Sequence, residues 1–206
     1  MTKGALVVLE GLDGAGTTTQ ARRLRDRLIR DGIAHLTREP SDGPIGRLLR
    51  EFLTGGHAIT GQAIDQTTFS LLFAADRADH VQREVDPAIA RGAVVISDRW
   101  YHSSYAYQAT GAERRWIRDL NRNARVPDLT IFLRVAPEIA AARRVAAGRV
   151  QELFEDLPMQ QRVAAGYDEV MTECAAAGER IEILDGAQAQ DAIAARINAL
   201  VDDLLR

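Results

Sequence analysis

The chain has 206 residues, with 26 Lys and Arg against 29 Asp and Glu, a formal net charge of -3 and a hydrophobic fraction of 46%. These values predict a single globular domain over residues 1–206, and the near-neutral balance disfavours a nucleic-acid partner, which would require a net basic face. No apolar run approaches the roughly 18–20 residues of a membrane span, and the N-terminal residues lack a signal-peptide pattern, so we expect no membrane partner and a cytoplasmic location.

Short apolar runs rich in Val, Ile and Leu recur along the chain and are typical of buried parallel strands. They cover residues 5–9, 33–37, 93–97, 129–135 and 181–184. Segments of 3.6-residue periodicity lie between them, including a long pattern over 64–90 and a final one over 193–204. This alternation predicts an α/β fold, a five-stranded parallel sheet with helices on both faces in three layers.

A glycine-rich segment, EGLDGAGTTTQ at residues 10–20, follows the first predicted strand and precedes a helical pattern. It fits G-x-x-x-x-G-K-[ST] at every position except the lysine. In such a loop the backbone N–H groups and the positive end of the next helix face phosphate oxygens. We therefore predict a phosphate-binding loop with Thr18 as a magnesium ligand; its binding residues are Gly11, Leu12, Asp13, Gly14, Ala15, Gly16, Thr17, Thr18 and Thr19.

Thr17 occupies the lysine position of this loop. That lysine normally reaches the β- and γ-phosphates, and losing one such group costs roughly 10²–10³ in rate. Lys3, the single lysine, precedes the first strand and is expected at the opposite end of the sheet. Two alternatives remain: an arginine from elsewhere supplies the charge, or the chain binds nucleotide and transfers phosphate poorly.

Asp98 and Arg99 follow the third predicted strand and are expected beside the phosphate loop. The carboxylate of Asp98 can hold magnesium directly or through water, and the guanidinium of Arg99 can bridge donor and acceptor phosphates. The alternative is a strand-end ion pair.

Two further groups of polar and aromatic residues are candidates for binding a ligand. Phe73 and Arg77 are four residues apart in a helical pattern and share a face, which would let them stack on and hydrogen-bond a pyrimidine, although core packing and a solvated surface are the usual alternative. Ser104, Tyr107 and Gln108 begin another helical pattern, where small hydroxyls could simply cap the helix.

Taken together, these motifs resemble the thymidylate kinase family, whose members phosphorylate dTMP with ATP. The likeness covers nearly the whole chain through LEGLDGAG, TREP at residues 37–40, LLFAADRADHV at 71–81, SDRWYHSSYAYQ at 97–108 and VPDLTIFL at 126–133. It implies a P-loop kinase that uses ATP and Mg²⁺, takes dTMP as its small-molecule substrate and forms a homodimer through helices in the 44–125 interval.

The resemblance also implies roles for individual residues. On the phosphate side, Arg99 would clamp the acceptor phosphate, Asp98 would support metal and acceptor, and Arg50 would contact phosphate. On the nucleoside side, Phe73 would stack on the base and Arg77 would read it. The remaining contacts would come from Ser104 at the thymine edge, Tyr107 near the sugar's 2′ position, Gln108 in the same pocket and Asp13 at the 3′-hydroxyl.

The segment from about 143 to 156 would form a lid over ATP. Leu153 stands where many family members have arginine, so Arg149 is the first candidate for the missing charge. Arg143 is the next, or it lies against the adenine; a solvated helix end is the alternative for both. The hypothesis is a thymidylate kinase making dTDP, with a weakly active nucleotide-binding homologue or a kinase for another pyrimidine monophosphate as alternatives.

Overall fold

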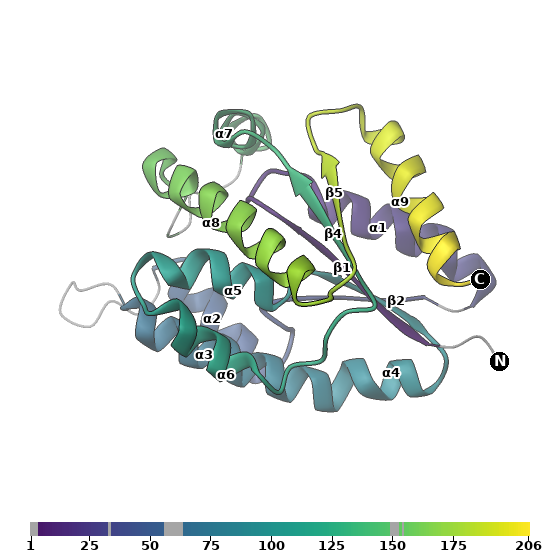
Figure 1. Cartoon of the computed structure of the whole chain (residues 1–206), viewed down its shortest axis with the longest axis horizontal. Helices are drawn as coiled ribbons and strands as arrows, with labels where there is room; N and C mark the ends of the chain where they lie inside the picture. Colours follow the sequence, from purple (N-terminus) through teal and green to yellow (C-terminus); the bar gives the residue numbers. More distant parts are fainter. Residues whose placement is uncertain (1–3, 33, 56–63, 149–152, 154) are drawn as a thin grey trace.

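Five parallel strands form the centre of the molecule in the computed structural model, which describes residues 4–32, 34–55, 64–148, 153 and 155–206 (Figure 1). The strands are β1 (Ala5–Gly11), β2 (Ala34–Arg38), β3 (Val94–Asp98), β4 (Leu129–Arg134) and β5 (Ile181–Asp185). Their order across the sheet is β2-β3-β1-β4-β5, and every pairing is parallel. All five strands agree with the sequence prediction to within a residue or two.

Helices cover both faces of this sheet, as predicted. The helices are α1 (Thr17–Leu28), α2 (Pro44–Leu53), α3 (Gln66–His80), α4 (Asp86–Ala90), α5 (Tyr101–Tyr107), α6 (Arg114–Asn121), α7 (Pro137–Ala146), α8 (Leu157–Ala176) and α9 (Gln190–Leu204). Short 3₁₀ turns follow α1 at Ile29–Asp31 and α5 at Gln108–Thr110. Helices α1 and α9 pack together on one face, while α4, α5 and α8 lie on the other (Figure 1).

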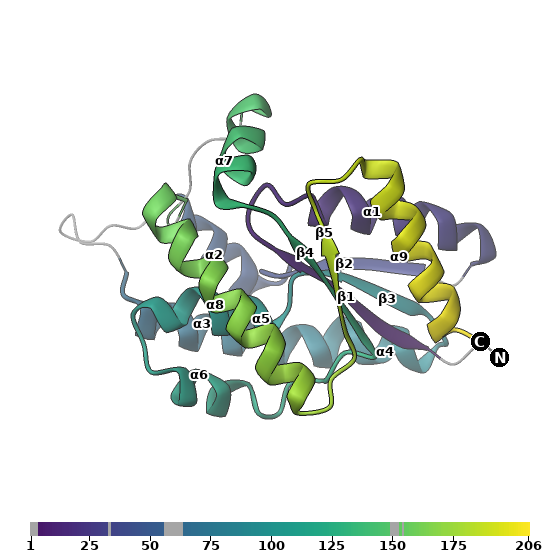
Figure 2. The ribbon, with the colours of Figure 1, turned by 45° about the horizontal axis from the view of Figure 1, so that its top comes forward.

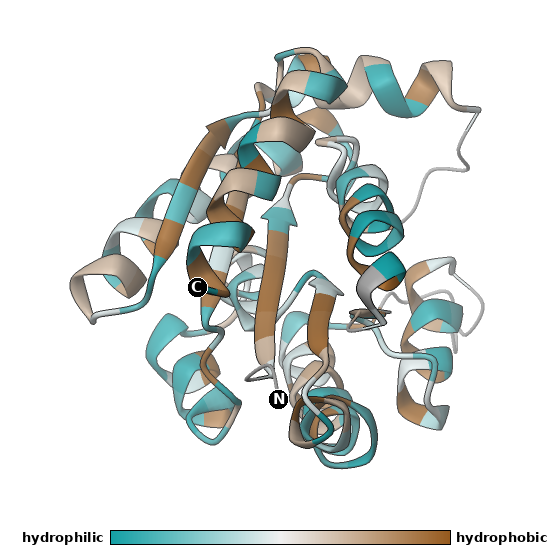
Figure 3. Cartoon of the chain, turned by 90° about the vertical axis from the view of Figure 1, so that its right-hand side faces the viewer, coloured by the Kyte–Doolittle hydropathy of each residue, from teal (hydrophilic) through white to brown (hydrophobic). Residues whose placement is uncertain are grey.

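The core lies against the middle of the sheet because β1 is flanked by strands on both sides. Residues Leu6 to Leu9 are completely buried. Val7, for example, pairs with Ile96 of β3 on one side and with Leu129 of β4 on the other. Figure 3 shows mostly hydrophobic strands between helices that mix hydrophilic and hydrophobic residues. Burial on both faces explains why β1, β3 and β4 read as continuous apolar runs, whereas the edge strands β2 and β5 are only partly buried.

The long helical pattern of residues 64–90 is one helical path with a change of pitch. Between α3 and α4 the chain forms a π-helical turn over Val81–Val85. Pro87 lies just beyond this turn and has no N–H to donate to the carbonyl four residues back, so the wider turn accommodates it. None of the described helices has the length and apolar character needed to cross a membrane.

Because all strands are parallel, their carboxyl ends meet at one edge. Gly11, Arg38 and Asp98 end three adjacent strands there. Helix α7 stands beyond the end of β4 at this same edge, as the turned view shows (Figure 2). Ligands of open α/β sheets bind at such an edge, so this is where a site is expected.

Candidate active site

A cleft of about 740 Å³ opens at the carboxyl edge of the sheet. Its wall contains most of the residues that the sequence singled out, namely Asp13, Gly14, Ala15, Gly16, Thr17, Thr18, Thr19, Arg50, Phe73, Arg77, Asp98, Arg99, Ser104, Tyr107, Gln108 and Arg143. Gly11 and Leu12 are buried behind the loop and do not line the cleft. Arg149 lies outside the described residues.

The glycine-rich loop connects β1 directly to α1. Gly14 and Gly16 adopt left-handed backbone conformations, with φ of 94° and 102°, which are unfavourable for residues that have a Cβ atom. Gly16 caps α1, so the free N–H groups of the first helical turn face the cleft. A Cβ on Gly14 would lie 2.4 Å from the carbonyl oxygen of Ala140, which shows how closely α7 packs on the loop. This geometry suits a phosphate chain.

Hard oxygen ligands meet beside the loop. The Thr18 hydroxyl, in the first turn of α1, hydrogen-bonds Oδ2 of Asp98 at the end of β3. Oδ1 of Asp98 is buried and has no hydrogen-bond partner among the described residues. A hydroxyl and a carboxylate with one free oxygen fit Mg²⁺, which binds through few protein oxygens and keeps several waters.

Arg99 lies between the two halves of the cleft. Its φ of 78° places it in the left-handed region, and its N–H donates to the Leu9 carbonyl at 2.9 Å. The guanidinium donates to Oδ1 of Asp13 at 2.8 Å and to the hydroxyls of Ser103 and Tyr167, each at 3.1 Å. Burial lowers the pKa of Arg99, but attraction to nearby groups, Asp13 above all, raises it by more, so Arg99 stays positively charged.

Buried Glu10 supports the backbone that carries Arg99. Its Oε1 accepts the Trp100 N–H at 2.7 Å, and its Oε2 accepts from the hydroxyls of Ser103 at 2.7 Å and Tyr167 at 2.9 Å. Burial alone would raise the pKa of Glu10, but hydrogen bonding and charge from His102, with Arg99, lower it. Glu10 therefore fixes the turn after β3 and two of the hydroxyls that contact Arg99.

The opposite end of the cleft is built around Arg77. This side chain is only 2% exposed and donates through Nε and Nη2 to one oxygen of Glu39, Oε2, at 2.8 and 2.6 Å. Nη1 hydrogen-bonds Oδ1 of Asn121, and Nη2 donates to the Ser104 hydroxyl at 3.2 Å. Four contacts thus hold one guanidinium at the cleft wall.

Aromatic and polar side chains complete this end. Phe73 lies one turn before Arg77 on α3 and is half-buried in the cleft wall. The Tyr107 hydroxyl donates to Oδ2 of Asp13 at 3.0 Å, and buried Gln108 follows it. Arg50 of α2 donates to the carbonyls of Pro40 and Ser41 at 2.6 and 2.7 Å, so it braces the turn after β2. Burial and repulsion from Arg38 lower the pKa of Arg50.

Two adjacent arginines of α7 contact the glycine-rich loop. Arg143 donates to the carbonyls of Ala15 at 3.4 Å and Gly186 at 2.9 Å. Arg144 is buried, hydrogen-bonds the Asp13 carbonyl and lies 3.6 Å from a carboxylate oxygen of Glu155. The predicted lid is described only in part, because 149–152 and 154 lie outside the described residues. The N–H of Leu153 donates to the Leu53 carbonyl of α2 at 3.1 Å.

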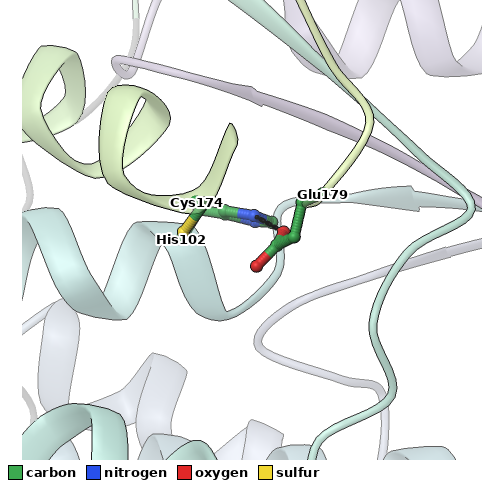
Figure 4. Close-up of side chains that lie close together, drawn as sticks. All are labelled: His102, Cys174 and Glu179. Carbon is green, nitrogen blue, oxygen red and sulfur yellow. Dashed lines mark hydrogen bonds and ion pairs between the residues drawn. The ribbon is translucent and has the colours of Figure 1, made fainter. Parts of the chain in front are cut away.

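His102, Cys174 and Glu179 form a cluster behind the site, in which His102 and Cys174 are buried and Glu179 is half-buried (Figure 4). Their side-chain N, S and O atoms lie within 4.8 Å of one another, and Nε2 of His102 is 2.9 Å from Glu179. On its other side, Nδ1 of His102 is 3.7 Å from Glu10. Burial opposes the charged form, but interactions with Cys174, Glu10 and Glu179 raise the pKa of His102 to about 10. His102 is thus a buried cation between two carboxylates, outside the wall of the cleft.

Sequence reasoning assigned no role to several residues that organise the cleft: Glu10, Glu39, Asn121, Arg144 and Tyr167. One signal was available, because Glu10 is an acid at the end of an apolar strand and buried acids require partners. Asn121 and Tyr167 come from α6 and α8, distant in sequence, and carry no such signal.

Comparison with known proteins gives a consistent result. Residues 9–197 match the family model described as thymidylate kinase. A probable thymidylate kinase of Pyrobaculum aerophilum is 37% identical over 203 residues, 98% of each chain, and one of Thermococcus kodakarensis is 38% identical over 205 residues, 97% of this chain and 98% of the relative. A thymidylate kinase of a Synechococcus species is 41% identical over 182 residues, 83% of this chain and 84% of the relative. These matches span both ends of the cleft.

Proposed function

The chain belongs to the thymidylate kinase family, and from that premise we propose that its cleft transfers the γ-phosphoryl group of ATP to dTMP, giving ADP and dTDP. The observation that carries the proposal is the position of Arg99. Its guanidinium lies between a phosphate-binding loop and the pocket around Arg77, and it contacts Asp13 of the loop directly. A transferred phosphoryl group must pass through this point.

The donor half binds the triphosphate. The N–H groups of the loop and of the first turn of α1 hold the phosphates, and Thr18 and Asp98 hold Mg²⁺. When bound, Mg²⁺ neutralises charge on the β- and γ-phosphate oxygens. Arg143 contacts the loop and Gly186 on the donor side, where adenine would lie.

The acceptor half binds the nucleoside monophosphate. Phe73 stacks on the base, Arg77 and Ser104 donate hydrogen bonds to its edge, and Gln108 lines the same pocket. Tyr107 crowds the sugar's 2′ position, and Asp13 accepts from the 3′-hydroxyl. Arg50 and Arg99 bind the acceptor phosphate, which is already ionised and needs no strong base.

Catalysis consists of positioning and charge neutralisation. Arg99 aligns the acceptor phosphate with the γ-phosphate for in-line attack. Because Thr17 brings no charge, the candidates to replace it are the two α7 arginines, which hydrogen-bond backbone carbonyls of the loop. Arg144 is close to Glu155, whereas Arg143 makes its described hydrogen bonds only to carbonyl oxygens, so Arg143 offers the larger uncompensated charge.

The test is ADP formation by the purified protein with ATP and Mg²⁺, comparing dTMP with dUMP, UMP, CMP and no acceptor. We expect turnover that requires dTMP. Preference for another monophosphate would assign a different pyrimidine substrate. Nucleotide binding without turnover on any acceptor would instead identify a nucleotide-binding protein. The uncharged residues Thr17 and Leu153 would then account for the missing activity.

The proposal includes two features of the protein's setting. One is a cytoplasmic location, and the other is a homodimer formed through helices of the 44–125 interval. Light scattering coupled to size exclusion would test the second, with a mass of about twice the 22.6 kDa of the chain expected.

A further inference from the structure

His80 is a buried histidine that the proposed reaction does not use. It is the last residue of α3, one turn after Arg77, and its side chain is fully buried. Its ring lies 5.8 Å from the ring of Trp100, and the guanidinium of Arg77 lies 5.9 Å from that same ring. His80 is thus packed directly behind the base-reading end of the cleft.

The carboxylate of Glu39 connects His80 with Arg77. Both N–H groups that Arg77 gives to Glu39 end on Oε2. The other oxygen, Oε1, lies 3.5 Å from Nδ1 of His80. Both of these atoms are buried, and neither makes a hydrogen bond of normal geometry with any of the described residues. They can therefore satisfy each other, with Nδ1–H as the donor and Oε1 as the acceptor.

The far side of the imidazole ring favours this arrangement. Nε2 of His80 is 2.7 Å from the Thr37 hydroxyl and 3.5 Å from Oε2 of Glu84. In the charged ring both nitrogens donate, Nδ1 toward Glu39 and Nε2 to the Thr37 hydroxyl, which in turn donates to Glu84. Burial opposes the charge, but the hydrogen bond and charge of Glu39, with Glu84 and Asp76, raise the pKa of His80. The carboxylates around the ring thus favour the charged form, in which Nδ1–H faces Glu39.

We propose that His80 is a positioning residue for base recognition: through Nδ1–H it fixes Glu39, which in turn fixes the guanidinium of Arg77 that reads the nucleobase. This inference rests on the proposed function. Without the donor, Oε1 of Glu39 would be a buried oxygen with no partner, and the carboxylate would rotate or take up a proton. Arg77 would then keep only the contacts to Asn121 and Ser104, and its orientation toward the base would loosen.

Two substitutions of His80 separate this role from simple packing. His80→Asn keeps an N–H donor near the Nδ1 position, whereas His80→Gln places its amide near the Nε2 position and loses the donor to Glu39. Arg83→Gln is the surface control, because Arg83 is 74% exposed and pairs with Asp79 away from the cleft. Thr37→Val is a second route, since it removes the hydroxyl that hydrogen-bonds Nε2 of His80 and thereby orients the ring.

The readouts are the Kd of dTMP and dCMP by calorimetry and the KM values for dTMP and ATP, with thermal unfolding to verify folding. We expect His80→Gln to weaken dTMP binding about tenfold, to reduce discrimination against dCMP and to leave the KM for ATP unchanged. His80→Asn and Arg83→Gln should stay within about twofold of the wild type. If His80→Gln does not fold, Thr37→Val should show the same shift in smaller degree.

Equal effects of the Asn and Gln substitutions, an equal rise in both KM values, or a folded Thr37→Val protein with unchanged dTMP binding would overturn the inference. Failure of the proposed function can be told apart from failure of this inference. If the wild-type protein binds dTMP without turnover, the proposed function fails, and the Kd values of the wild type and the His80 variants for dTMP still test the role of His80. A wild-type protein that does not prefer dTMP to dCMP would overturn both.

Discussion

Arginine performs tasks in this cleft that a lysine could not. The Arg99 guanidinium contacts Asp13, Ser103 and Tyr167 at the same time. Its backbone is in the left-handed region, which a non-glycine residue adopts only where surrounding contacts hold it there. A planar fork of five donors can keep these contacts and still bind phosphate, whereas an ammonium group is a single point of charge. The residue type is therefore as important here as the charge.

Replacing Arg99 by lysine should reduce kcat for dTMP phosphorylation by about 10²–10³-fold, because the proposed alignment of the acceptor phosphate needs the guanidinium fork. Steady-state kinetics would measure this. The matched control is Arg134→Lys, at an arginine whose side chain is 53% exposed and pairs with Asp168. Similar kinetics for the two variants would contradict the role of Arg99.

The charge supplied by Arg143 can be tested against the missing lysine. We expect Arg143→Ala to lower kcat by about 10²-fold and Thr17→Lys to restore about tenfold in that background, since both place a cation at the same phosphates. Thr17→Lys alone should raise turnover or leave it flat. A large loss of nucleotide binding on Thr17→Lys would show that the loop is placed incorrectly, and additive effects would exclude a shared role.

At the scale of elements, the glycine-rich loop and α7 act as one unit. The carbonyl oxygen of Ala140 lies 2.4 Å from the position that a Cβ on Gly14 would take, and Arg143 and Arg144 contact loop carbonyls. Helix α7 also leads into the predicted lid. The loop is thus held from outside the β1–α1 connection that sequence motifs describe, and a displacement of α7 would move the phosphate site.

The pair Gly14→Ala and Gly178→Ala tests this coupling. Both glycines have nearly the same φ, 94° and 95°, but a Cβ on Gly178 meets nothing within 4 Å. Each change should cost about 1–2 kcal/mol in backbone strain, and Gly14→Ala should add about 1–3 kcal/mol from the clash. Urea unfolding and ATP titration would separate them: only Gly14→Ala should weaken ATP binding. Equal ATP affinity in both variants would argue against coupling.

At the scale of the whole molecule, a buried charge cluster joins the sheet to both helices behind it. Glu10 of β1, His102 of α5 and Glu179 just before β5 form one row, and α8 contributes Cys174. Removing one member would leave a buried charge without its partner, which is among the costliest changes a protein can undergo. The stability of the structure around the cleft therefore depends on the protonation of His102, which does not line the cleft.

This cluster predicts alkaline loss of stability. The pKa of His102 is raised from 6.5 to about 10, so its stabilising contribution is fully present below pH 6.5 and is lost as the pH rises through about 10. The free energy of unfolding should fall by up to about 1.4 kcal/mol per pH unit between these values. Urea unfolding at several pH values would show it, and His102→Gln should remove the slope. A wild-type slope that persists in this variant would assign it to another group.

The sequence by itself determined the parallel α/β sheet and most of the cleft wall. The reason is local: apolar runs specify buried strands, the glycine pattern specifies the loop after β1, and strands that run parallel bring Thr18, Asp98 and Arg99 to one edge. The family motifs added Phe73 and Arg77 on α3. These residues follow fixed short-range patterns, so their placement needed no knowledge of packing.

Only the tertiary structure decided which side chains hold these residues in place. Glu10, Glu39, Asn121 and Tyr167 act through contacts that span 38 to 157 positions along the chain. Which arginine contacts the loop was also a tertiary matter, because it depends on how α7 packs on Gly14. Buried polar groups find partners wherever the fold brings a complementary atom, and no local pattern records that choice.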